Sequence, residues 1–146
     1  MPWVDALCDG GRMTNLDNVK TIYEAFGRGD VPAILERLAD DITWEYQPIS
    51  TDVPWLQARK GRTGAAGFFQ SLAEMQIRHF AVKQLLASDR LVVALVDIEF
   101  DVVKTGKSVR EVDEVHLWHF DDHGRVARFR HVTDTHQHQL AWRGQA

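Results

Sequence analysis

Cysteine, basic charge and long apolar runs are scarce in this sequence, and each shortage argues against a class of protein. Cys8 is the only cysteine, so no disulfide can form within the chain. The 17 lysines and arginines are outnumbered by 21 aspartates and glutamates, and no basic stripe marks a nucleic-acid surface. No run reaches the ~20 apolar residues of a membrane helix, and no signal-peptide core is visible. We therefore expect a cytoplasmic protein that binds neither nucleic acid nor membranes.

Several motifs of catalytic and metal sites are also missing. The segment GRTGAAG at 61–67 lacks the lysine and the spacing of a P-loop, and no Ser-His-Asp signature is present. Six of the seven histidines follow residue 115, but their expected positions do not converge as zinc ligands do. We expect neither a cofactor nor a metal ion.

The N-terminal half has the pattern of three helices. After a cap at Thr14 or Asn15, apolar residues recur at helical spacing until Gly27 and Gly29. Asp30 is expected to cap a short second helix, and a third is expected to begin at Thr63. With 146 residues, the chain is long enough for one domain. We assign 1–13 to an N-terminal extension, 14–141 to the domain and 142–146 to a tail.

The second half alternates apolar and polar residues, which is typical of strands. We expect strands at 42–46, 80–87, 91–103, 109–120 and 125–134. Helices followed by a run of antiparallel strands predict an α+β fold. The expected shape is a half-open cone, with three N-terminal helices packed on one curved, mainly antiparallel sheet.

The most informative segment is REVDEVHLWHFDDHGRVARFRHVTD, at 110–134. It is predicted to form a hairpin with a histidine in each strand, His116 and His131. A two-residue turn at 122–123 would place His116 opposite Phe129 and His131 opposite Glu114. One face would then carry Glu114, His116, Trp118, Ala127, Phe129, His131 and Thr133. Two imidazoles among aromatic rings on a concave face indicate a small-molecule pocket.

Three segments carry a family resemblance: IYEAFGRGDVPAILERLADDITWEY, GRTGAAGFFQSL and HFDDHGRVARFRHVTDT. Together they resemble the nuclear-transport-factor-2-like superfamily, and most of all its SnoaL-like and ketosteroid-isomerase-like branches. The resemblance covers about residues 14–141. It implies a cone-shaped α+β barrel with a deep apolar pocket, often a homodimer. Functions differ widely across this fold, so site residues must be compared one by one.

That comparison excludes the best-known enzymes of the superfamily. Ketosteroid isomerases use an Asp base with Tyr and Asp donors, and the resemblance places these at Tyr46, Ile22 and His116. Limonene-epoxide-hydrolase-like members have Arg and Asp where this chain has Val96 and Ile98. SnoaL-type cyclases carry an acid/base residue on the last strand near an imidazole on the preceding strand. His131 and His116 match that arrangement, with His in place of Asp.

We take His116, His131 and Tyr46 as candidate catalytic residues. The expected pocket walls are Trp44, Trp118, Phe129, Glu114, Phe100, Phe69 and Trp55. The alternative for the two histidines is a hydrogen-bonded structural role, and the alternative for Tyr46 is simple packing at a strand end. Asp134 is expected to cap a terminal helix, with catalysis as its alternative.

Three functions stay open at this point. The first is a cofactor-free isomerase, cyclase or lyase acting on a small hydrophobic carbonyl or polycyclic compound. It would use histidine acid-base chemistry, with Tyr46 as oxygen donor. The second is a non-catalytic binder or carrier of a small apolar ligand. The third is a dimeric protein-interaction module, suggested by apolar residues on the outer sheet face such as Leu95 and Val115. A homodimer explains that face equally well.

Overall fold

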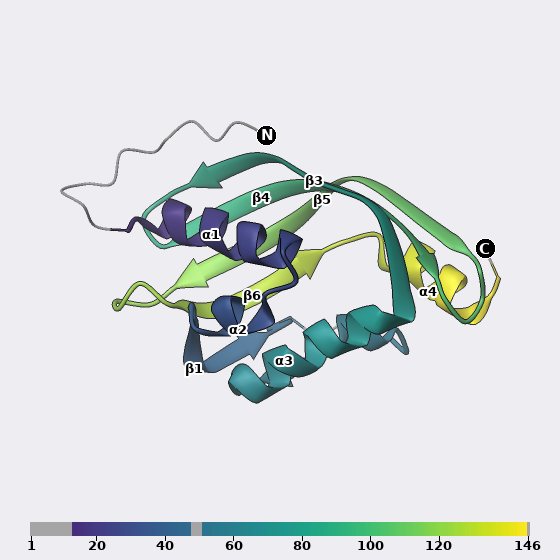
Figure 1. The fold of residues 1–146 in the computed structure, drawn as a ribbon, viewed down its shortest axis with the longest axis horizontal. Coiled ribbons are helices and arrows are strands. Elements are labelled where there is room, and N and C mark those ends of the chain that lie inside the picture. The colour runs from purple at the N-terminus through teal and green to yellow at the C-terminus, as the bar shows by residue number, and fades with distance from the viewer. Residues whose placement is uncertain (1–12, 48–50, 146) are drawn as a thin grey trace.

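The computed structural model describes residues 13–47 and 51–145. It confirms the α+β prediction: α1, α2 and α3 lie across one face of a strongly curved sheet, and α4 lies beyond one end of it (Figure 1). Cys8 and the expected N-terminal extension, apart from Met13, lie outside the described residues. In the part of the chain that the structure describes, every helix is too short or too polar to span a membrane.

Capping side chains set where most of the helices begin. α1 (Asn15–Gly27) starts with a capping box, in which Thr14 and Asp17 bind each other's backbone N–H groups at 3.0 and 3.1 Å. Asp30 caps α2 (Val31–Leu35), as predicted. α3 (Gly61–Ser71) begins two residues before the expected Thr63.

A fourth helix, α4 (Thr135–Arg143), lies near the end of the described chain. Asp134 caps it by accepting the Gln137 N–H at 3.2 Å, which is the expected helix-cap role. Residues 142 and 143, expected in a tail, belong to this helix. Trp142 packs edge-on against Trp55, with ring centroids 5.8 Å apart.

The sheet has six strands in the order β2-β1-β6-β5-β4-β3. These are β1 (Leu38–Trp44), β2 (Arg59–Lys60), β3 (Met75–Ala87), β4 (Leu91–Val102), β5 (Ser108–Phe120) and β6 (Val126–Val132). β1 runs parallel to β6, and all other neighbours are antiparallel. The sheet does not close, because β2 and β3 remain its two edges.

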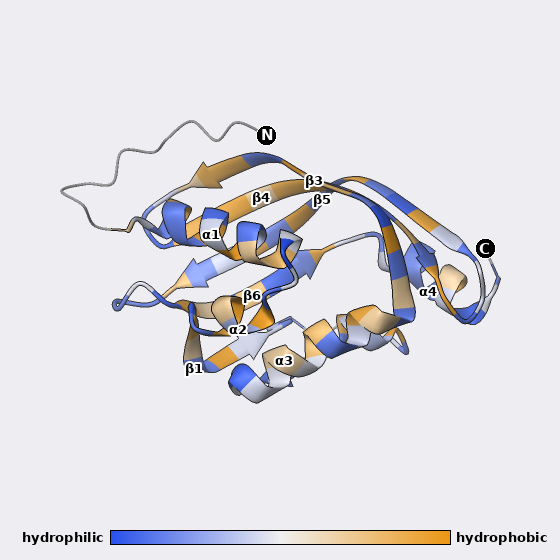
Figure 2. Ribbon diagram, in the orientation of Figure 1, coloured by the Kyte–Doolittle hydropathy of each residue, from blue (hydrophilic) through white to orange (hydrophobic). Residues whose placement is uncertain are grey.

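The alternation of β4 separates the core from the outer face, as predicted. Every second side chain is buried against the helices: Val92, Ala94, Val96, Ile98, Phe100 and Val102. The intervening carboxylates form partly exposed ion pairs, such as Asp97 with Lys83 at 3.0 Å. Figure 2 shows the apolar run along β4 beneath the helices.

The hairpin of β5 and β6 has a different register from the one expected. His116 pairs directly with His131, and Trp118 with Phe129. The two-residue turn was wrong, because the loop is longer: the Asp121 N–H donates to the Arg125 carbonyl at 2.9 Å. A shift of two residues leaves the same side chains on the same face. It therefore brings the two imidazoles closer together than predicted.

Candidate functional site

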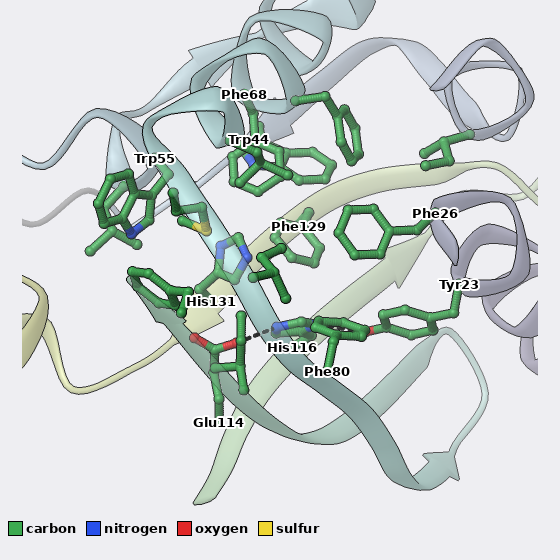
Figure 3. A pocket seen from close by; sticks show the side chains of 18 of the residues that line it. Tyr23, Phe26, Trp44, Trp55, Phe68, Phe80, Glu114, His116, Phe129 and His131 are labelled. Carbon is green, nitrogen blue, oxygen red and sulfur yellow. Dashed lines mark hydrogen bonds and ion pairs between the residues drawn. The ribbon is translucent and has the colours of Figure 1, made fainter. Parts of the chain in front are cut away.

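A cavity lies between the helices and the concave face of the sheet. All seven predicted wall residues line it, together with His116 and His131 (Figure 3). Further apolar walls come from α1, α3 and β3, including Tyr23, Phe26, Phe68 and Phe80. About 70 Å³ of the cavity is open to the centre of a water-sized sphere, which suits a small ligand better than a polycyclic one.

His116 lies in a buried chain of hydrogen bonds. The Trp118 indole can only donate, and it donates to the Tyr23 oxygen at 3.0 Å. Tyr23 in turn donates its own proton to His116 Nδ1 at 2.6 Å, which leaves Nε2–H to donate to Glu114 at 2.8 Å. Burial raises the pKa of Tyr23 and lowers the pKa of His116. Around pH 7, both groups are therefore neutral.

Glu114 is the charged end of this chain. Burial alone would raise the pKa of Glu114, but the hydrogen bond from His116 and the nearby imidazoles lower it to about 2. A pKa below the unfolded value means that ionised Glu114 stabilises the folded state above about pH 4.5. That contribution is lost as the pH falls toward 2.

The Glu114→Gln variant tests this sign. We expect its free energy of unfolding to fall less steeply than that of the wild type between pH 4.5 and pH 2. Urea unfolding at several pH values measures both slopes. Glu99→Gln, which changes a partly exposed carboxylate on the outer face, is the control. Equal slopes for wild type and Glu114→Gln would mean that Glu114 has an ordinary pKa.

His131 is held by a second carboxylate. Its Nδ1 and its backbone N–H both contact Glu45 Oε1, the latter at 3.0 Å. Burial opposes the charged imidazole, but Glu45, together with Glu114 and Glu111, outweighs burial, so the pKa of His131 is raised above 6.5. Within the described chain, Nε2 has no hydrogen-bond partner. The ring lies 4.8 Å from that of His116, in an edge-on arrangement.

A left-handed residue at the end of β1 explains why Glu45 reaches this site. Regular alternation would bury Tyr46 and expose Glu45, but Glu45 has φ 57° and interrupts the strand. Glu45 is consequently buried, and Tyr46 lies outside the cavity. The Tyr46 hydroxyl is 2.8 Å from Nε2 of His119 on the outer face. The expected role of Tyr46 as a ligand-oxygen donor in the cavity therefore has no geometric basis.

A bulge in β5 turns a third carboxylate toward the protein interior. Val96 pairs with Glu114 but Ile98 pairs with Glu111, so β5 contains one extra residue here. Asp113, with φ 63°, lies within this bulge. Glu111 and Glu114, three positions apart, therefore both face inward and are 8% and 5% exposed.

Glu111 accepts from three partners at once. These are the Thr133 hydroxyl, Nε2–H of His138 and the Asp134 backbone N–H, the last at 3.1 Å. The Trp55 indole donates to His138 Nδ1 at 2.9 Å, which places the single proton of a neutral His138 on Nε2. A third Glu–His pair therefore lies beside the cavity, with His138 in the cavity lining, and the sequence did not reveal it.

The residues best placed to hold a metal ion are Glu111, Glu114 and His138, whose ligand atoms lie within 4.8 Å of one another. Each of them already makes a hydrogen bond: Glu111 with His138, and Glu114 with His116. Hydrogen bonding accounts for this cluster without an ion. The absence of a metal and of a cofactor stays a prediction.

Comparison with known proteins identifies the family of this chain. A similar solved structure is an NTF2-like protein of unknown function from Burkholderia pseudomallei, with 27% identity and a TM-score of 0.71, covering 84% of this chain and 92% of that one. A candidate polyketide cyclase from Xanthomonas campestris, at 20% identity, has a TM-score of 0.67 with 88% and 96% covered, which shows the fold alone. The search of curated proteins gave no match. The model of the SnoaL-like domain matches residues 19–129, so the chain belongs to the SnoaL-like family.

Proposed function

We propose that this protein is a cofactor-free enzyme that moves a proton on a small hydrophobic carbonyl compound, with His131 as the acid-base residue. The observation that carries the proposal is the geometry of His131. Glu45 binds Nδ1 and leaves Nε2 free in an apolar cavity. A carboxylate behind an imidazole fixes its orientation and stabilises the imidazolium that forms on proton uptake.

The chemistry follows from the atoms in place. Neutral His131 takes a proton from the carbon next to the carbonyl through Nε2. The electron pair of the broken C–H bond becomes the C=C bond of an enolate, and the carbonyl oxygen takes the negative charge. The imidazolium then returns the proton to the same or another carbon. Glu45, Glu114 and Glu111 all favour the protonated state of His131.

The test is exchange of α-protons in D₂O. Cyclohexanone incubated with the protein should gain deuterium at the α-carbons faster than in buffer alone, which ¹H NMR follows directly. Protein with the cavity blocked by a tighter-binding competitor serves as the control. If cyclohexanone binds but exchanges at the buffer rate, the protein is a binder of small apolar ligands, which is the alternative function.

The pH profile gives a second prediction. Because the base must be neutral, we expect the exchange rate to rise with pH, with a midpoint above 6.5. Glu45→Gln removes the nearest of the charges that raise the pKa of His131 and leaves burial, so the midpoint should move to lower pH. The same pKa can be read from the imidazole resonances. An unchanged midpoint in Glu45→Gln would mean that Glu45 does not influence the ionisation that limits the rate.

A homodimer remains a prediction. The outer face of β4 and β5 presents part-buried apolar side chains: Val93, Leu95, Val115 and Leu117. A symmetric interface would cover this face and leave the cavity untouched, because the cavity lies on the other face of the sheet. Sedimentation velocity distinguishes monomer from dimer.

A further inference from the structure

The three tryptophans that line the cavity differ in what their indole N–H groups bind. Trp118 donates to the Tyr23 oxygen at 3.0 Å, and Trp55 donates to His138 Nδ1 at 2.9 Å. Both therefore serve the internal networks of the site. Trp44 does not: its Nε1 is buried and, among the described residues, has no acceptor. Trp44 is the cavity tryptophan with a donor to offer.

The surroundings of Trp44 explain why no protein group satisfies this donor. The ring is 1% exposed, with Phe129 stacked 4.0 Å away on one side and Phe68 centred 4.9 Å away. These aromatic neighbours offer no hydrogen-bond acceptor. A buried donor without a partner is costly, and native proteins seldom retain one without a reason.

The position of Trp44 suggests that reason. Its ring is 6.5 Å from that of His131 and meets it edge-on, and both rings line the same cavity. In Figure 3 Trp44 lies on one side of the cavity and Glu114 on the other, with His131 between them. The carbonyl oxygen and the α-carbon of a ketone are two bonds apart, so at this separation one small ligand can place its oxygen toward Trp44 and its α-carbon toward Nε2 of His131.

We infer that the Trp44 indole N–H donates a hydrogen bond to the carbonyl oxygen of the bound ligand. This inference rests on the proposed function and adds the group that holds the substrate oxygen. As the α-proton leaves, negative charge develops on that oxygen, and a donor already in place stabilises it. Trp44 thus takes the role of oxygen donor that the sequence suggested for Tyr46.

The charges around the cavity narrow the ligand class further. Three buried carboxylates, Glu45, Glu111 and Glu114, surround the imidazoles. His116 is neutral, so a ligand carboxylate would enter a region of excess negative charge and be repelled. The ligand class is therefore an uncharged ketone or aldehyde rather than a carboxylic acid.

The test compares two ligands of nearly the same shape, cyclohexanone and methylenecyclohexane, which differ in the acceptor oxygen. Trp44→Phe keeps an aromatic ring and removes the N–H. We expect the affinity for cyclohexanone to fall about 3- to 10-fold more than the affinity for methylenecyclohexane. Trp142→Phe, a tryptophan of α4 outside the cavity lining, is the matched control and should leave the ratio of the two affinities unchanged.

A second measurement needs no substitution. In ¹⁵N-labelled wild type, the indole N–H resonance of Trp44 should move downfield on adding cyclohexanone and much less on adding methylenecyclohexane. Equal losses of affinity in Trp44→Phe, or a Trp44 resonance that responds alike to both ligands, would overturn the inference. If the protein exchanges α-protons but neither Trp44 readout distinguishes the two ligands, the proposed function stands and only the role of Trp44 is refuted.

Discussion

Replacing Glu111 by alanine is expected to lower the free energy of unfolding by about 3–5 kcal/mol. The carboxylate is 8% exposed and accepts from Thr133, His138 and the Asp134 backbone. Alanine leaves all three donors buried with no replacement, and the neighbouring Asp134 starts α4. Urea unfolding at pH 7 measures the loss.

A carboxylate on the outer face provides the control. Glu99 pairs with Arg110 at 3.5 Å in a partly exposed ion pair, so Glu99→Ala should cost no more than about 1 kcal/mol. If Glu111→Ala were as mild as Glu99→Ala, the buried network around His138 would not contribute to stability as described.

The second large effect is on catalysis. His131→Ala should slow α-proton exchange of cyclohexanone by about 10²- to 10⁴-fold, the usual contribution of a positioned general base. The fold should survive, because alanine keeps the backbone N–H that donates to Glu45. Deuterium incorporation followed by ¹H NMR gives the rate, and circular dichroism confirms folding.

His119 is the matched control for this substitution. It is on the same hairpin but on the outer face, where it contacts Tyr46 and Arg128. His119→Ala should exchange cyclohexanone at the wild-type rate. Equal rates for His131→Ala and wild type would remove His131 from the mechanism.

Much of the architecture could be predicted from local sequence signals. Thr14, Asp30 and Asp134 cap helices because their side chains reach backbone N–H groups that would otherwise have no partner. The strict alternation of β4 predicted which side chains face the core. The inward position of His116 and His131 also followed from alternation, and it survived a wrong turn length because the register shifted by an even number of residues.

Alternation failed where the backbone is irregular, and those places shape the site. Glu45 and Asp113 both adopt positive φ, which sequence patterns predict poorly for residues other than glycine. The positive φ of Glu45 buries its own side chain and leaves Tyr46 on the outer face. Asp113 belongs to the bulge that buries Glu111. No local pattern pairs His138 with Glu111, because only the packing of α4 brings the two side chains together. These pairings depend on tertiary structure.

Tyr23 was missed for a different reason. Its place on the apolar face of α1 was predicted, but an aromatic residue at helical spacing is typical of a core residue. Only the pairing of α1 with β5 in space shows that its hydroxyl bridges Trp118 and His116. The sequence identified the imidazoles, and the structure supplied the groups that set their protonation.

The most direct test of His131 as the acid-base residue is its NMR titration with and without cyclohexanone. We predict a pKa above 6.5 in the free protein, and a change in that pKa when the ketone binds. The contrary result is a His131 whose titration is unaffected by a ketone that demonstrably occupies the cavity. That outcome would make the imidazole a structural residue and the protein a ligand binder.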